Sequence, residues 1–136
     1  MQERSSADPY ARLREDAARL ARKHGGNLDR LAYDPALKVR RLFDAPAIVM
    51  LDEVGKGGIR VGAGARPVGV VRFRRDGQYD ILLLAGLPKS KAAKTLAHEI
   101  GHVRSDQLLS DRSERAAEVW SLAWRYEALR RQYDIK

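Results

Sequence analysis

Residues 91–105 read KAAKTLAHEIGHVRS and contain the pattern His-Glu-x-x-His, formed by His98, Glu99 and His102. On a helix, residues four positions apart lie on one face, so both imidazoles can approach the same metal ion. Glu99 lies about 100° round the helix, where its carboxylate can reach a water on that ion without replacing it. Catalytic zinc binds neutral imidazole nitrogens and keeps one position open for water. The segment therefore predicts a catalytic Zn²⁺ site with Glu99 as general base.

The residues around this pattern favour a buried helix that faces a cleft. Leu96, Ile100 and Val103 form an apolar stripe with i, i+4, i+7 spacing. Gly101 lowers helix stability by roughly 0.5–1 kcal/mol relative to alanine, and a second backbone packed closely at this point would explain its presence. An amphipathic helix with exposed histidines is the alternative. It explains neither this context nor the placement of two of the chain's three histidines at metal-ligand spacing.

The composition limits the kinds of protein that this chain can be. A length of 136 residues predicts one domain, residues 1–136, with an ordinary core. No apolar run approaches the length of a membrane span, and the N-terminal MQERSSADPY lacks the apolar core of a signal peptide. Because the chain has no cysteine, any metal must be held by histidine and carboxylate. We expect a cytoplasmic protein with no membrane partner.

The net charge of +8 is compatible with an acidic partner or with nucleic acid. The basic residues are spread along the chain, however, and aromatic residues make up only 7% of it. That distribution favours an arginine-rich surface over a nucleic-acid interface.

The remaining pattern predicts an α+β fold, in which N-terminal helices and a small, largely antiparallel sheet precede the helix of His98. Asp76-Gly77 is a turn signal between two β-rich runs and predicts a hairpin. The expected elements are helices at 9–24 and, in two pieces, 27–45, strands at 48–51, 59–61, 68–74 and 79–84, a turn at 62–67, the motif helix, and a final helix at 111–133.

A zinc site needs a third protein ligand besides the two histidines. The final helix offers Glu114 and Glu118, and a chain that turns back after His102 brings their face against the motif helix. An N-cap at Asp111 would engage Glu114 in a capping box, which favours Glu118 as the ligand. Glu114 would then orient a histidine. The predicted metal ligands are His98, His102 and Glu118, with Glu114 as the open alternative.

Three other residues are weaker candidates for the site. His24 falls in the last turn of the first helix, where the helix dipole explains it. Asp106 lies four residues after His102 and is either a histidine-orienting group or a surface residue. Tyr126 is a candidate for a second donor to the oxyanion.

The segment TLAHEIGH, from Thr95 to His102, resembles the ImmA/IrrE family of gluzincin metallopeptidases. In that family a strand leads to a helix of the form T-L-A-H-E-[LI]-G-H, and residues 81–102, ILLLAGLPKSKAAKTLAHEIGH, are similar to the whole passage. The family's later helix carries E-A-N-x-F-A, whose glutamate is the third zinc ligand. The segment EVWSLA, which starts at Glu118, matches that helix only at its glutamate and final alanine. The family's apolar-Met-Pro ending is absent.

The resemblance implies a minimal zincin-like domain and a zinc-dependent metallopeptidase, with zinc-bound water activated by Glu99. It further implies an intracellular protein substrate such as a repressor or regulator. A substrate strand is expected to add to a sheet edge near 68–73 or 79–84. The alternative is a regulatory or DNA-associated binding protein that retains a zincin fold with little or no proteolytic activity.

Overall fold

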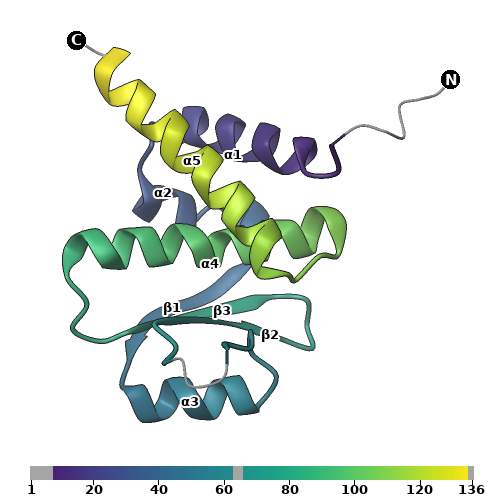
Figure 1. The fold of residues 1–136 in the computed structure, drawn as a ribbon, viewed down its shortest axis with the longest axis vertical. Helices are drawn as coiled ribbons and strands as arrows, with labels where there is room; N and C mark the ends of the chain where they lie inside the picture. The colour runs from purple at the N-terminus through teal and green to yellow at the C-terminus, as the bar shows by residue number, and fades with distance from the viewer. Residues whose placement is uncertain (1–7, 63–65, 135–136) are drawn as a thin grey trace, which may run out of the picture.

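The computed structural model describes residues 8–62 and 66–134, which form a mixed α+β fold (Figure 1). The described residues contain five α-helices, one 3-10 helix and a three-stranded sheet. In chain order these are α1 (Ala11–Lys23), α2 (Leu28–Ala32), the 3-10 helix η2 (Pro35–Leu37), β1 (Val39–Ala45), α3 (Ala47–Gly55), β2 (Gly69–Phe73), β3 (Tyr79–Leu84), α4 (Lys89–Leu109) and α5 (Glu114–Asp134).

The helices lie on both faces of the sheet (Figure 1). Helix α4 lies across one face and α3 covers the other, while α5 crosses α4 and also packs against α1. The main core includes Ile81 of β3, Ile100 of α4 and Trp120 of α5, and a smaller core around Met50 lies between α3 and the sheet. Helix α4 is therefore the central element of the fold. None of the helices in the described ranges combines the length and apolar character that a membrane crossing requires.

The sheet has the strand order β1-β3-β2, with β3 parallel to β1 and antiparallel to β2. The predicted hairpin is confirmed: Gly77 has a φ of 80°, and the Asp76 carboxylate accepts the N–H of Gln78 at 3.0 Å. The sheet is mixed rather than largely antiparallel, because the chain enters β1 before α3 and then adds the hairpin. Since β3 is the central strand and is paired on both sides, the expectation of a free edge at 79–84 is wrong.

The predicted helical segment at 27–45 is only partly helical. Asp34 caps η2 and Pro35 begins it, and Lys38 ends it in the left-handed region with a φ of 56°. The chain then enters β1, so the predicted helix is wrong over these residues. Val39 and Leu42 have helical spacing, but pairing with β3 decides the conformation of this segment.

The predicted strand at 48–51 belongs to α3, which follows Pro46 as its N-cap. A short apolar run does not by itself distinguish a buried strand from a helix. Met50 is fully buried, whereas Ile48 is 80% exposed. The predicted strand at 59–61 is also wrong: Ile59 donates one hydrogen bond to the Val71 carbonyl oxygen (3.3 Å) and forms no strand. The predicted turn at 62–67 lies partly outside the described residues.

A buried ion pair links α1 to α4, and a tryptophan of α5 donates a hydrogen bond to it. Asp16 of α1 accepts hydrogen bonds from Nε and Nη2 of Arg104 in α4, at 2.8 and 2.6 Å. It also accepts one from Trp120 Nε1 in α5, at 3.0 Å. Burial raises the pKa of Asp16, but the donors from Arg104 and Trp120 outweigh it and hold that pKa below its ordinary value.

Candidate metal centre

The candidate metal centre lies where α5 crosses α4. A Cβ atom on Gly101 would lie 2.4 Å from the carbonyl oxygen of Ala117, so a larger residue could not stand here without moving α5 away. This confirms the expectation that a second backbone packs closely against Gly101. The crossing carries the first two turns of α5 to the face of α4 that bears His98 and His102.

Glu114 bridges the two histidines of the motif. Its Oε1 lies 2.9 Å from Nε2 of His98, and its Oε2 lies 2.9 Å from Nε2 of His102. One ligand atom from each of the three residues can be chosen so that all lie within 4.8 Å of one another. Two imidazole nitrogens and one carboxylate are donor types that a divalent metal such as Zn²⁺ accepts.

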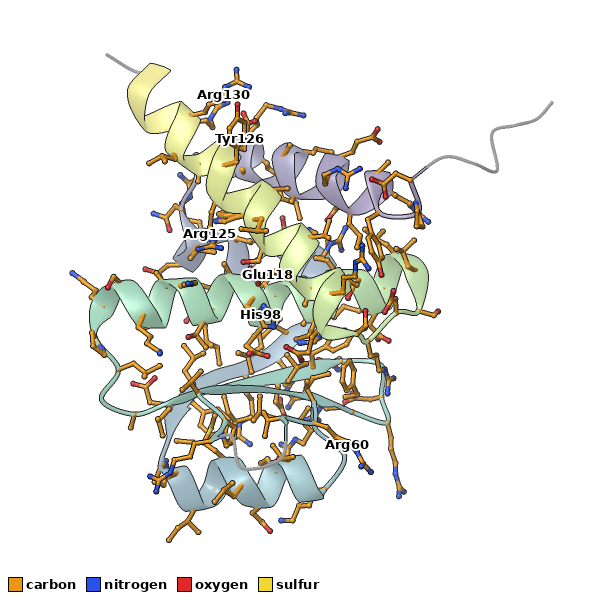
Figure 2. All side chains as sticks on the ribbon, viewed as in Figure 1. Arg60, His98, Glu118, Arg125, Tyr126 and Arg130 are labelled. Carbon is orange, nitrogen blue, oxygen red and sulfur yellow. The ribbon has the colours of Figure 1, made fainter. Side chains whose placement is uncertain are left out.

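Glu118 contacts the other ring nitrogen of His98, and Figure 2 shows the two side chains next to each other between α5 and α4. Its Oε1 lies 3.1 Å from His98 Nδ1, and its Oε2 lies 3.8 Å from Nη2 of Arg125. An Nδ1–H that donates to a carboxylate leaves Nε2 available to a metal. Glu118 thus contacts His98 on the Nδ1 side only. The group whose ligand atoms lie close enough to share an ion is His98, His102 and Glu114, and not the predicted set with Glu118.

The start of α5 explains why Glu114 is available to the histidines. Ser113 Oγ accepts the N–H of Ala116 at 3.1 Å, and the Asp111 carboxylate accepts the N–H of Ser113 at 2.8 Å. Glu114 is the first residue of α5, so it does not occupy the third helical position that a capping box requires. The predicted capping box between Asp111 and Glu114 is therefore wrong.

The histidines and Glu114 shift one another's protonation. The hydrogen bond that His98 donates to the Glu114 carboxylate is the main reason that the pKa of His98 is raised to about 9, and interaction with Glu99 adds to it. Hydrogen bonds from His102 and His98 hold the pKa of Glu114 well below its usual range. The metal-free cluster therefore keeps a proton on His98 at neutral pH.

Glu99 is buried beside β2, with 5% of its surface exposed. Within the described part of the chain, its Oε1 has no hydrogen-bond partner. Burial raises the pKa of this carboxyl group to about 8. A Cβ atom on Gly69 would lie 2.7 Å from Oε2 of Glu99. Gly69 was not predicted as a site residue, although a glycine in a strand often marks such a close approach.

A cavity of about 480 Å³ opens beside the cluster, and its lining includes Val68, Lys91, Lys94, His98 and Glu99. A larger cavity of about 940 Å³ lies between α2, β1, α4 and α5 and contains neither histidine of the cluster. Of these two cavities among the described residues, the smaller one adjoins His98.

The three weaker candidates lie outside the cluster. Nε2 of His24 contacts Oδ2 of Asp34 at 2.8 Å, which is a contact between α1 and the start of η2. Asp106 accepts a hydrogen bond from the Tyr79 hydroxyl at 2.7 Å and so joins α4 to β3. Tyr126 is 67% exposed and lines a groove between α1 and α5, away from the histidines.

No family model, no curated protein and no solved structure was found to match this chain. The similarity to the ImmA/IrrE family therefore depends on the motif residues alone, and the activity of that family enters only as a proposal.

Proposed function

We propose that this chain is a zinc-dependent metallopeptidase with a zincin-like fold, which hydrolyses peptide bonds of an intracellular protein. The proposal rests mainly on one observation: Glu114 reaches Nε2 of both His98 and His102, and the buried Glu99 lines the adjoining cavity. The ImmA/IrrE resemblance extends the proposal to a regulatory protein as substrate.

Three residues of the cluster would act as metal ligands, and a fourth would orient one of these ligands. His98, His102 and Glu114 would hold the ion, and Glu118 would orient His98 through Nδ1. When bound, zinc supplies a Lewis acid that polarises a peptide carbonyl and makes water more acidic. The positive charge would also lower the pKa of Glu99 from its raised value and so favour the carboxylate.

Glu99 would act as the general base and then as the acid. Its carboxylate takes a proton from the water whose oxygen attacks the carbonyl carbon of the peptide. As the C–N bond breaks, the same carboxyl group gives that proton to the leaving amine. The absence of a hydrogen bond to Glu99 Oε1 within the described residues leaves this oxygen available for the proton.

The substrate would pair with the outer edge of β2. The Leu84 N–H donates to Val68 O, and the Arg74 N–H donates to the Gln78 carbonyl oxygen. By the alternation of an antiparallel pair, the N–H and C=O groups of Gly69 and Val71 therefore point away from β3. Ile59 already donates to the Val71 carbonyl. The backbone N–H and C=O groups of Gly69, which lies next to Glu99, are thus better placed than those of Val71 to bind a substrate backbone.

Substitution of Glu99 by glutamine tests this function. The zinc-loaded wild type and the Glu99→Gln variant are each incubated with a library of peptides prepared from a cell lysate, and new peptide ends are identified by mass spectrometry. We expect new ends with the wild type, none with Glu99→Gln, and one zinc per chain in both. Glu15→Gln, a change of an exposed glutamate on α1, should cleave as the wild type does. Equal cleavage by Glu99→Gln would contradict the assignment, and a wild type that cleaves nothing would favour a binding role.

A further inference from the structure

The cavity beside Glu99 has a basic end. It extends from His98 along the first turns of α4 to Lys91 and Lys94, both of which line it. Both lysines are exposed, and neither forms an ion pair with a carboxylate among the described residues. The two carboxyl groups of the cavity, Glu99 and Glu118, lie toward its other end, where Glu118 is already engaged by His98 and Arg125.

The start of α4 adds to this positive charge. The 21-residue helix has Pro88 at its N-cap, no side-chain hydrogen bond at the cap and no acidic residue in its first turn. The N-terminus of a helix carries a partial positive charge, so lysines in the first two turns are unfavourable there unless an anion is bound. Glu99 lines the same cavity, is buried, and has an oxygen without a hydrogen-bond partner among the described residues. A buried polar group of this kind indicates a ligand-binding cavity and not a shallow surface depression.

The spacing of the lysines can be converted into positions on a substrate. Lys94 and Lys91 precede His98 by four and seven residues, which is about 6 and 10 Å along a helix axis at ~1.5 Å per residue. An extended peptide advances about 3.3 Å per residue. For an extended peptide that runs along α4 from His98, the two lysines would therefore lie about two and three residues from the bond that the water activated by Glu99 would attack.

We propose that Lys91 and Lys94 form a cationic subsite that selects peptides with a carboxylate about two to three residues from the scissile bond. This inference rests on the proposed peptidase function and names its substrate class. The carboxylate can belong to an aspartate or glutamate side chain or to the C-terminus of the peptide, because all present the same anion.

The test compares cleavage specificity in a charge-reversed variant with that in a matched control. The zinc-loaded wild type, the Lys91→Glu/Lys94→Glu variant and an Arg40→Glu/Arg75→Glu variant are profiled on the same peptide library. The control makes the same change in net charge, and neither of its residues lines the cavity.

We expect wild-type and control cleavage sites enriched in aspartate or glutamate two to three residues from the cut, or cuts that release two or three C-terminal residues. The first pattern identifies a side-chain carboxylate and the second a terminal one. In the lysine variant we expect kcat/KM for such peptides to fall by roughly fivefold for each lysine reversed, as for an exposed ion pair. Cleavage without this enrichment, or with enrichment unchanged by the reversal, would overturn the subsite. Absence of all cleavage by the wild type would instead contradict the peptidase function, and the subsite with it.

Discussion

Gly101 of α4 lies so close to Ala117 of α5 that a Cβ atom on Gly101 would come within 2.4 Å of the Ala117 carbonyl oxygen. This contact sets the distance between the two helices. Because Glu114 and Glu118 lie on either side of Ala117 in α5, the same contact determines how far their carboxylates stand from His98. A packing feature of the fold thereby controls the geometry of the candidate metal centre.

Replacement of Gly101 by alanine should therefore affect stability and metal binding together. The added methyl group must push α5 away from α4, which should lower the free energy of unfolding by about 1–3 kcal/mol. The same shift should weaken zinc binding, because Glu114 moves away from the histidines. Urea denaturation and a competitive zinc titration measure the two effects.

Gly55 provides the matched control for that substitution. It ends α3, and a Cβ atom added there meets nothing within 4 Å, so Gly55→Ala should leave both quantities unchanged or slightly raise stability. A Gly101→Ala protein as stable as the wild type, with unchanged zinc affinity, would show that the helix contact does not set the site.

A second glycine substitution should separate catalysis from metal binding. In Gly69→Ala, the new methyl group would meet Glu99 Oε2 and Thr95 Cγ2, each at 2.7 Å, and so displace the proposed base. We expect peptide hydrolysis to fall at least roughly tenfold, as for a misplaced catalytic group, while zinc affinity stays near that of the wild type. Gly62→Ala, where the methyl group meets nothing within 4 Å, is the control. Undiminished hydrolysis in Gly69→Ala would contradict the placement of Glu99.

Much of the site was predictable because its signals are local. The spacing of His98 and His102 needs only a helix, and Gly101 indicated a close neighbouring backbone. The choice between Glu114 and Glu118 was not predictable in the same way. The choice depends on where α5 begins. With Ser113 as the cap, in place of the predicted Asp111, Glu114 is the first residue of the helix and not the third.

The fold was predictable where turn chemistry is strong and less so where apolar runs are short. Asp76-Gly77 predicted the hairpin, and β3 has the expected bounds. The segment that forms β1 and α3 was assigned the opposite way, since Val39 and Leu42 fit a helix and Ile48 to Leu51 fit a strand. Pairing of residues 39–45 with β3, which is distant in sequence, decides which of the two segments becomes the strand.

The Asp16–Arg104 pair should make stability sensitive to acid. The folded-state pKa of Asp16 lies below its ordinary value, so its stabilising contribution is present above about pH 4 and is lost as pH falls further. In Asp16→Asn, the Arg104 guanidinium stays buried without a carboxylate, and we expect a loss of about 3–5 kcal/mol at pH 7. Urea denaturation between pH 3 and 7 should show a steeper acid loss in the wild type than in the variant. Parallel pH profiles would contradict the role given to Asp16.

Zinc binding should release a proton from His98. The pKa of His98 in the metal-free chain is about 9, and zinc binds only the neutral imidazole. Below pH 9 this proton should therefore make zinc affinity rise about tenfold per pH unit, and above pH 9 that dependence should disappear. Calorimetric titrations in buffers of different ionisation enthalpy count the protons released. A zinc affinity that does not change between pH 6 and 8 would be inconsistent with a protonated His98.

A zinc titration of three proteins tests the metal centre most directly: the wild type, Glu114→Gln and Glu118→Gln, each with a chromophoric chelator as competitor. We predict one tight zinc per wild-type chain and a loss of tight binding in Glu114→Gln, which lacks a ligand. In Glu118→Gln we predict an affinity about 10- to 100-fold lower, as for loss of a histidine-orienting carboxylate. No stoichiometric zinc in the wild type, or a larger loss in Glu118→Gln than in Glu114→Gln, would contradict the centre described by His98, His102 and Glu114.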